Sequence, residues 1–162
     1  MPTYFRDSYV IGLQMRSTDS GYLDEPKDFL KFIQCALDIE KIYNSKFKSK
    51  EKESFKWFIA TDSDKLRNWT QSKYPDKVFY AKGRVAHVGW DAGGLKRVLL
   101  DIELLSRCNE IVVTGGSTFG WIAAMKMLKL PYYITGFSKM ETCLRAKLNL
   151  SPVNRNGAAV FK

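Results

Sequence analysis

The sequence has 162 residues, of which 45% are hydrophobic and 14% aromatic, and its formal net charge is +9. This length and composition fit one globular domain, while no apolar stretch is long enough to span a bilayer and the N-terminus lacks the apolar core of a signal peptide. The positive charge favours anionic partners, namely nucleotides, nucleic acid or acidic membrane surfaces, without choosing among them.

The first predicted strand is the apolar run Tyr9–Leu13, which is followed by a polar stretch containing Gln14 and Arg16. In open α/β sheets, ligands bind at the carboxyl ends of the strands, so Arg16 is a candidate ligand contact. The alternative is a solvated surface arginine. Pro26 is predicted to begin a crossover helix, because apolar residues recur after it at helical spacing.

The second predicted strand is Phe55–Ala60, and Asp62 after it is expected to cap the next helix. Asp62 and Asp64 also form a D-x-D pattern, which in some sugar-nucleotide enzymes holds a divalent metal on a diphosphate. A metal bound by only two carboxylates must complete its coordination shell with ligand phosphates and water. A metal-dependent sugar-nucleotide enzyme therefore stays open as a minor alternative.

The third predicted strand is Val78–Tyr80, and a glycine-punctuated loop over residues 81–94 contains the only histidine, His87. A helix is predicted over Leu95–Ser106, with aliphatic residues along one stripe and Asp101 at its edge. An acidic residue in that position is either a solvated residue beside the stripe or a hydrogen-bond acceptor near a ligand.

The stretch Ile111–Ala124 (IVVTGGSTFGWIAA) combines a short β-branched strand, a glycine-rich turn and the start of a helix. Ser117 or Thr118 is expected to cap that helix. Free N–H groups, the positive end of the helix dipole and two hydroxyls would then face one point and form an anion site. The alternative is a tight turn with an ordinary cap.

The chain is expected to end with a strand in Lys129–Ile134, a helix over about Ser138–Lys147 and a loop-like tail. We therefore predict a Rossmann-like, three-layer α/β domain with a parallel sheet over residues 1–148, and a tail over 149–162. The P-loop motif is absent and no G-x-G-x-x-G follows the first strand, which excludes a P-loop NTPase and an NAD-type fingerprint.

Cys35, Cys108 and Cys143 show neither metal-ligand spacing nor an even-numbered disulfide framework, so they are predicted to be small buried hydrophobic residues. Glycosylation sequons begin at Asn68 and Asn149. About one such sequon is expected by chance in a chain of this composition, so the two only weakly favour a secretory lumen. A proline follows the second sequon and makes it a poor acceptor.

Three stretches resemble fucosyltransferases in their order along the chain: Val10–Arg16 (VIGLQMR), Ala60–Ser63 (ATDS) and Leu104–Gly120, which ends in Ser-Thr-Phe-Gly. The sequence is most similar to the plant-type xyloglucan fucosyltransferases, with a resemblance that runs from about Tyr9 to about Ile134. It implies the C-terminal, donor-binding half of a GT-B glycosyltransferase.

The resemblance also implies inverting transfer of fucose from GDP-fucose to a glycan or protein acceptor, with no metal cofactor. Arg16 would contact the diphosphate, Asp101 would accept from the guanine ring, and Asp19 is the candidate general base. The other residues expected at the nucleotide sugar are Gln14, His87, Gly116, Ser117, Thr118 and Phe119.

The catalytic unit of this family has two Rossmann-like halves and the sequence supplies one, so an N-terminal half is expected to be missing from this chain. The resemblance implies the Golgi or another secretory lumen. The runner-up function is a non-catalytic module that keeps the nucleotide pocket. Nucleic-acid binding is disfavoured, because the basic residues are scattered among acidic ones.

Overall fold

The computed structural model describes residues 3–17, 29–46, 54–83, 92–134 and 143–147. Its strands are β1 (Tyr9–Met15), β2 (Phe55–Thr61), β3 (Val78–Phe79), β4 (Glu110–Thr114), β5 (Tyr132–Ile134) and β6 (Leu144–Arg145). Its helices are α1 (Tyr4–Asp7), α2 (Leu30–Lys46), α3 (Asp64–Lys73), α4 (Ala92–Leu105) and α5 (Thr118–Lys126). None of these described helices has the length and apolar character needed to cross a membrane.

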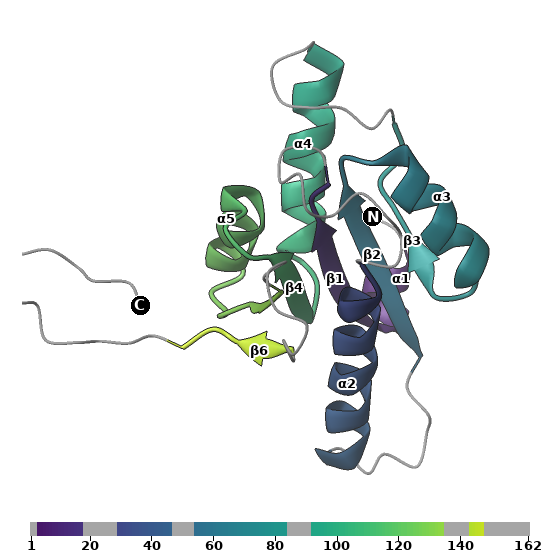
Figure 1. The fold of residues 1–162 in the computed structure, drawn as a ribbon, viewed down its shortest axis with the longest axis vertical. Coiled ribbons are helices and arrows are strands. Elements are labelled where there is room, and N and C mark those ends of the chain that lie inside the picture. The colour runs from purple at the N-terminus through teal and green to yellow at the C-terminus, as the bar shows by residue number, and fades with distance from the viewer. Residues whose placement is uncertain (1–2, 18–28, 47–53, 84–91, 135–142, 148–162) are drawn as a thin grey trace, which may run out of the picture.

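The strands form one sheet in the order β3-β2-β1-β4-β5-β6 (Figure 1). Neighbouring strands of the described sheet run parallel, except for β6, which is antiparallel to β5. The two central strands, β1 and β4, are almost continuously apolar because they are buried on both faces. The predicted α/β class is therefore confirmed, and the predicted parallel arrangement holds for every described strand except β6.

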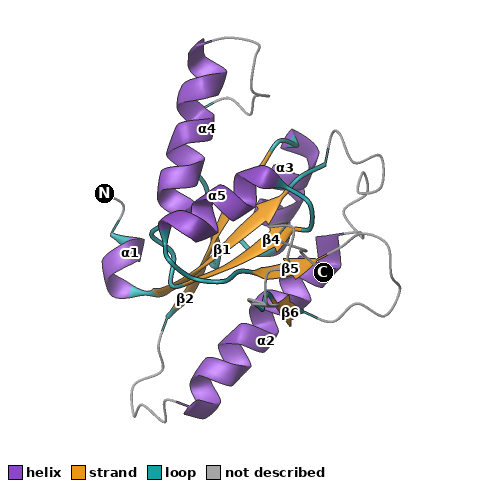
Figure 2. Cartoon of the chain, turned by 90° about the vertical axis from the view of Figure 1, so that its left-hand side faces the viewer, coloured by secondary structure: helices purple, strands orange, loops and turns teal. Residues whose placement is uncertain are grey.

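Helices cover both faces of the sheet and make three layers, with α2 on one side and α4 and α5 on the other (Figure 2). Successive side chains of a strand point to opposite faces, so Ile11 and Leu13 pack in the cluster under α2 and α3, while Val10 packs in the cluster under α4 and α5. At Gly12, an added Cβ would lie 2.9 Å from Cδ2 of Leu105, so α4 lies very close to β1.

The predicted apolar stripe on the helix after residue 91 is wrong at Leu95 and Leu99, although Ile102 and Leu105 do pack toward the sheet. Leu95 and Leu99 are 49% and 58% exposed, whereas Arg97 and Asp101 are buried. The buried residues 97, 101, 104, 105 and 108 follow helical spacing, and they turn a different face of α4 toward the sheet. The inner face of α4 therefore carries charged side chains in its first half and leucines in its second.

The predicted helix over Ser138–Lys147 is wrong at Leu144 and Arg145, which form the edge strand β6, and residues 135–142 lie outside the described residues. β6 pairs with β5, and Arg145 lies over the Tyr132 ring, 5.1 Å from its centroid, and reaches Glu110 at 3.2 Å. The predicted tail over 149–162 also lies outside the described residues.

The prediction for the cysteines is wrong for two of the three. Cys35 in α2 and Cys143 before β6 form a disulfide, with their Cα atoms 5.0 Å apart and a sequence separation of 108. Cys108 is a free, buried cysteine, as predicted, and burial raises the pKa of its thiol. No local spacing could indicate the pair, because its members come from opposite ends of the domain.

Candidate active site at the carboxyl edge of the sheet

The candidate site lies where β1, β2 and β4 end. These strands are parallel and in register, with Met15 opposite Thr61 and Gln14 opposite Val113. The segments that follow them therefore begin at one edge of the sheet. The structure thus brings together the ends of strands that carry Arg16, Asp62 and the Gly116–Phe119 turn, as the sequence predicts.

Gln14 and Thr114 join the ends of β1 and β4. The Thr114 N–H donates to Oε1 of Gln14 at 3.1 Å, and the Thr114 hydroxyl donates to the Gln14 carbonyl at 3.1 Å. The Arg16 N–H donates to Oγ1 of Thr114 at 3.0 Å. This network fixes the backbone of Arg16 beside the turn that follows β4. The sequence-based prediction gave Thr114 no role at this site.

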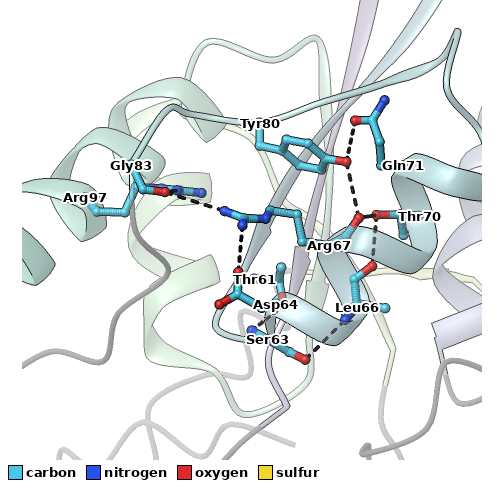
Figure 3. A network of polar contacts seen from close by, with 10 residues as sticks. All are labelled: Thr61, Ser63, Asp64, Leu66, Arg67, Thr70, Gln71, Tyr80, Gly83 and Arg97. Atoms are coloured by element: carbon cyan, nitrogen blue, oxygen red, sulfur yellow. Dashed lines mark hydrogen bonds and ion pairs between the residues drawn. The ribbon is translucent and has the colours of Figure 1, made fainter.

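Asp62 joins the ends of β1 and β2, because its Oδ1 accepts from the Ser17 N–H at 2.8 Å. The prediction that Asp62 caps α3 is wrong. Ser63 is the N-cap, and its hydroxyl oxygen accepts from the Leu66 N–H at 3.2 Å (Figure 3). Asp62 instead accepts a hydrogen bond from Ser17, just after the end of β1, and this bond holds the backbone of Ser17 in place.

The second acid of the D-x-D pattern, Asp64, is engaged within α3. It forms an ion pair of 2.7 Å with Arg67 one turn further along the helix (Figure 3). Within the ranges that the structure describes, no three His, Cys, Asp or Glu residues gather as a metal-binding group. The two carboxylates of the D-x-D pattern have separate partners.

The turn between β4 and α5 leaves a buried hydroxyl without a partner. Gly116 has a φ of +79°, which glycine adopts without strain, and the Ser117 N–H donates to the Thr114 carbonyl at 3.0 Å. Ser117 occupies the N-cap position, but its side chain makes no capping hydrogen bond. Its Oγ is buried and has no hydrogen-bond partner among the described residues. The prediction that a hydroxyl caps α5 is therefore wrong for the side chain of Ser117.

The first turn of α5 presents N–H groups that no intrahelical carbonyl can reach, as in every helix. Thr118 is exposed and Phe119 is half-buried against the cluster under α4 and α5. Helix N-termini bind anions in proteins, and the unpartnered hydroxyl of Ser117 belongs to the N-cap residue of α5. The geometry suits a phosphate or diphosphate group.

The buried pair on α4 consists of Asp101 and Arg97. Nε of Arg97 donates to both carboxylate oxygens of Asp101, at 3.0 and 2.9 Å. Nη1 of Arg97 donates to the Gly83 carbonyl at 3.0 Å, and Figure 3 shows these two residues. Burial raises the pKa of Asp101 to about 6, and Arg97 opposes that shift. The contact with Arg97 favours the ionised carboxylate. Arg97 was missed, although its i,i+4 spacing from Asp101 is a recognisable signal.

Two predicted site residues, Asp19 and His87, lie outside the described residues. The loop that contains His87 follows Gly83, whose carbonyl accepts from Arg97 and, at 3.5 Å, from Arg67 (Figure 3). The described start of this loop is thus attached to both α3 and α4.

Close contact between α5 and β4 depends on Gly120. An added Cβ would lie 2.7 Å from Oε1 of Gln14 and 2.7 Å from Cβ of Val113. We expect Gly120→Ala to lower the free energy of unfolding by about 1–3 kcal/mol, because the buried Val113 side chain has no room to move aside. Urea denaturation measures this change.

The comparison variant is Gly116→Ala, where an added Cβ has nothing within 4 Å but the positive φ would be strained. Backbone strain alone is expected to cost this variant about 1 kcal/mol. Wild-type stability for Gly120→Ala would contradict the close packing of α5 on β4.

Neither a protein-family model nor a curated protein matches this sequence. Among solved structures, NodZ alpha-1,6-fucosyltransferase from Bradyrhizobium, soaked with GDP-fucose, matches 75% of this chain and 37% of its own length, with 24% identity and a TM-score of 0.50. A variant of FUT1 from Arabidopsis thaliana in complex with GDP matches 80% of this chain and 30% of its own length, with 16% identity and a TM-score of 0.51.

The chain spans about a third of the length of these two solved fucosyltransferases. At such identities the likeness concerns the arrangement of the backbone, and it agrees with the resemblance of the sequence motifs. The described α/β domain has the fold of one part of a fucosyltransferase.

Proposed function

We propose that this chain is the donor-binding half of a GT-B fucosyltransferase and that it binds GDP-fucose at the carboxyl edge of its sheet. The observation that carries the proposal is the buried, unpartnered hydroxyl of Ser117 at the N-terminus of α5, next to the turn to which Arg16 is attached. The two solved fucosyltransferases with this fold were studied with GDP-fucose and with GDP, which supports a guanine nucleotide as the ligand.

In the proposed complex, the diphosphate lies at the N-terminus of α5. The N–H groups of Thr118 and Phe119 and the Ser117 hydroxyl would donate to phosphate oxygens, and Gly116 would let the backbone approach closely. Arg16 would add a charged, forked set of donors. The network of Gln14 and Thr114 would hold Arg16 in position.

Fucosyl transfer breaks the bond between the sugar and the phosphate, and negative charge develops on the departing diphosphate. Donors that are already oriented toward that charge stabilise the transition state more than the ground state. We propose inversion at the anomeric carbon through an oxocarbenium-like transition state. Asp19 is proposed as the general base, Asp101 as the acceptor for the guanine ring, and His87 as a further nucleotide contact.

No metal is required in this scheme, because Arg16 and the helix N-terminus supply the positive charge. The acceptor, a glycan or glycoprotein, would bind to the N-terminal half of such an enzyme. The Golgi or another secretory lumen is the proposed compartment, and the disulfide supports it, since disulfides persist in oxidising compartments.

The second candidate function is a module that binds the nucleotide sugar without transferring fucose. The anion-binding arrangement at the N-terminus of α5 would serve such a module equally well. The two functions differ in one measurement: with an acceptor present, a fucosyltransferase releases GDP from GDP-fucose, whereas a binding module leaves the nucleotide sugar intact.

The proposal is tested by calorimetric titration of GDP, GDP-fucose, UDP and ADP, each with and without EDTA. Selective binding of both guanine nucleotides, unchanged by EDTA, is the expected result. Absence of GDP binding to the folded chain would contradict the proposed donor site, and loss of binding on chelation would instead favour the metal-dependent alternative at Asp62 and Asp64.

Two variants are expected to weaken GDP binding in different ways. Arg16→Ala should weaken it about 10- to 100-fold, because a charge-assisted contact is lost. Ser117→Ala should weaken it several-fold and should also raise the melting temperature, because it removes a buried hydroxyl that has no partner in the free protein.

The matched control is Arg107→Ala. Arg107 is an exposed arginine just beyond the end of α4, and it pairs with Glu103. Its affinity for GDP should equal that of the wild type. An Arg16→Ala variant with wild-type affinity would show that the diphosphate lies elsewhere.

A further inference from the structure

The exposed face of α3 carries an acceptor sequence for N-linked glycosylation, Asn68-Trp69-Thr70, to which the proposed function gives no role. Asn68 is exposed in the middle of the helix. The residues one turn before and after it are also exposed, and they are Asp64, Lys65, Gln71 and Ser72. An oligosaccharide on Asn68 would therefore extend into solvent without displacing any packed side chain.

A second, independent observation concerns the compartment. The disulfide between Cys35 and Cys143 belongs to a protein that folds under oxidising conditions. In eukaryotic cells, the endoplasmic reticulum provides these conditions together with the oligosaccharide donor. We infer that Asn68 is an acceptor for an N-linked oligosaccharide.

The reaction is a glycosyl transfer from an oligosaccharide that is linked to a lipid diphosphate. The amide nitrogen of Asn68 forms a bond to the anomeric carbon of the first sugar and loses a proton. The bond between that carbon and the diphosphate oxygen breaks, and the lipid diphosphate leaves with the electron pair. No oxidation or reduction takes place.

The folded structure determines when this transfer takes place. Thr70 is 0% exposed, and its hydroxyl donates to the carbonyls of Leu66 at 3.0 Å and Arg67 at 2.9 Å (Figure 3). A transferase that must reach the hydroxyl of the sequon cannot reach it in the folded domain. Transfer to Asn68 therefore precedes the packing of α3 on the sheet.

The sequence allows an interval in which Asn68 has been synthesised but α3 is not yet packed on the sheet. The ten-residue α3 buries only Leu66 and Thr70, and isolated helices shorter than about 12–15 residues are marginal in water. The helix therefore depends on packing against the sheet. The central pairing of that sheet, between β1 and β4, cannot form until Glu110–Thr114 has been synthesised. The disulfide cannot form until Cys143 has been synthesised. The sequon thus emerges well before the sheet on which α3 packs is complete.

The experiment expresses the full chain behind a secretion signal in eukaryotic cells and measures the intact mass before and after digestion with peptide N-glycosidase. We expect one oligosaccharide, which Asn68→Gln removes. Asn149→Gln is the matched control, and it should leave the mass of the oligosaccharide unchanged because a proline follows that sequon.

A second variant, Thr70→Val, destroys the sequon while it keeps a side chain of similar size in the buried position. It should remove the oligosaccharide without loss of secretion. Mild reduction during expression, which delays the disulfide, should increase the glycosylated fraction. Secreted, disulfide-bonded protein without an oligosaccharide, or an oligosaccharide that persists in Asn68→Gln, would overturn the inference. Nucleotide binding plays no part in this test.

Discussion

Reduction of the Cys35–Cys143 disulfide is expected to lower the free energy of unfolding by about 2–5 kcal/mol. The bond closes a loop between cysteines 108 residues apart, and loops of this length restrict the unfolded chain strongly. It also attaches the segment before β6 to α2, whose Cys35 is fully buried. Chemical denaturation with and without a reducing agent measures the change.

The double variant Cys35→Ala/Cys143→Ala should be less stable than the wild type and should no longer respond to the reducing agent. Cys108→Ala is the control, because Cys108 is buried and has no disulfide partner. That variant should keep the full response to reduction. A wild-type protein whose denaturation midpoint is the same in both conditions would contradict the bond.

Glu40→Ala is expected to lower the free energy of unfolding by about 2–4 kcal/mol, because it leaves buried and partly buried donors without their acceptor. Nε1 of the fully buried Trp57 donates to Oε1 of Glu40 at 2.7 Å. Nζ of Lys77 donates to both oxygens of the same carboxylate, at 2.8 and 2.7 Å, and lies 4.7 Å from the centroid of the Trp57 ring. Glu40 therefore links α2 to β2 and to the start of β3.

Glu40→Gln should be less severe than Glu40→Ala, because the amide oxygen still accepts from Trp57. The control is Glu103→Gln on α4, whose carboxylate also pairs with two cations, Arg107 and Lys126, but at the surface. Such pairs contribute little, so its melting temperature should stay close to that of the wild type. Equal losses for the Glu40 and Glu103 variants would show that burial of the Glu40 cluster adds no stability.

The sequence predicted the parts of the fold that depend on local pattern. Tyr9–Leu13 and Ile111–Val113 are apolar because both faces of each strand are buried, and this signal identified the two central strands, β1 and β4. The glycine-rich turn after Val113 was predicted because a strand, a turn and a helix follow each other within a few residues. The position of Arg16 at the carboxyl edge of the sheet was predicted in the same way, because Arg16 follows the strand β1.

Features that depend on distant parts of the chain were not predictable. Ser63 and Asp62 are both favourable caps, and only the contact of Asp62 with Ser17 decides between them. The sequence indicated a helix for α4 but not its buried face, because the Arg97–Asp101 pair replaces apolar residues there. The unpartnered hydroxyl of Ser117 depends on the path of the turn, which residue types alone leave undetermined.

The sheet ends on both sides in very short strands, and this bears on how the protein behaves at high concentration. β3 and β6 have two residues each, and positive charges lie beside them at Lys77 and Arg145. Long, flat edge strands act as templates for pairing with other chains, whereas short, charged edges discourage it. The strongly apolar strands β1 and β4, which would aggregate most readily, have neighbours on both sides. The short edges of the described sheet therefore disfavour edge-to-edge association, even though Leu95 and Leu99 are exposed on α4.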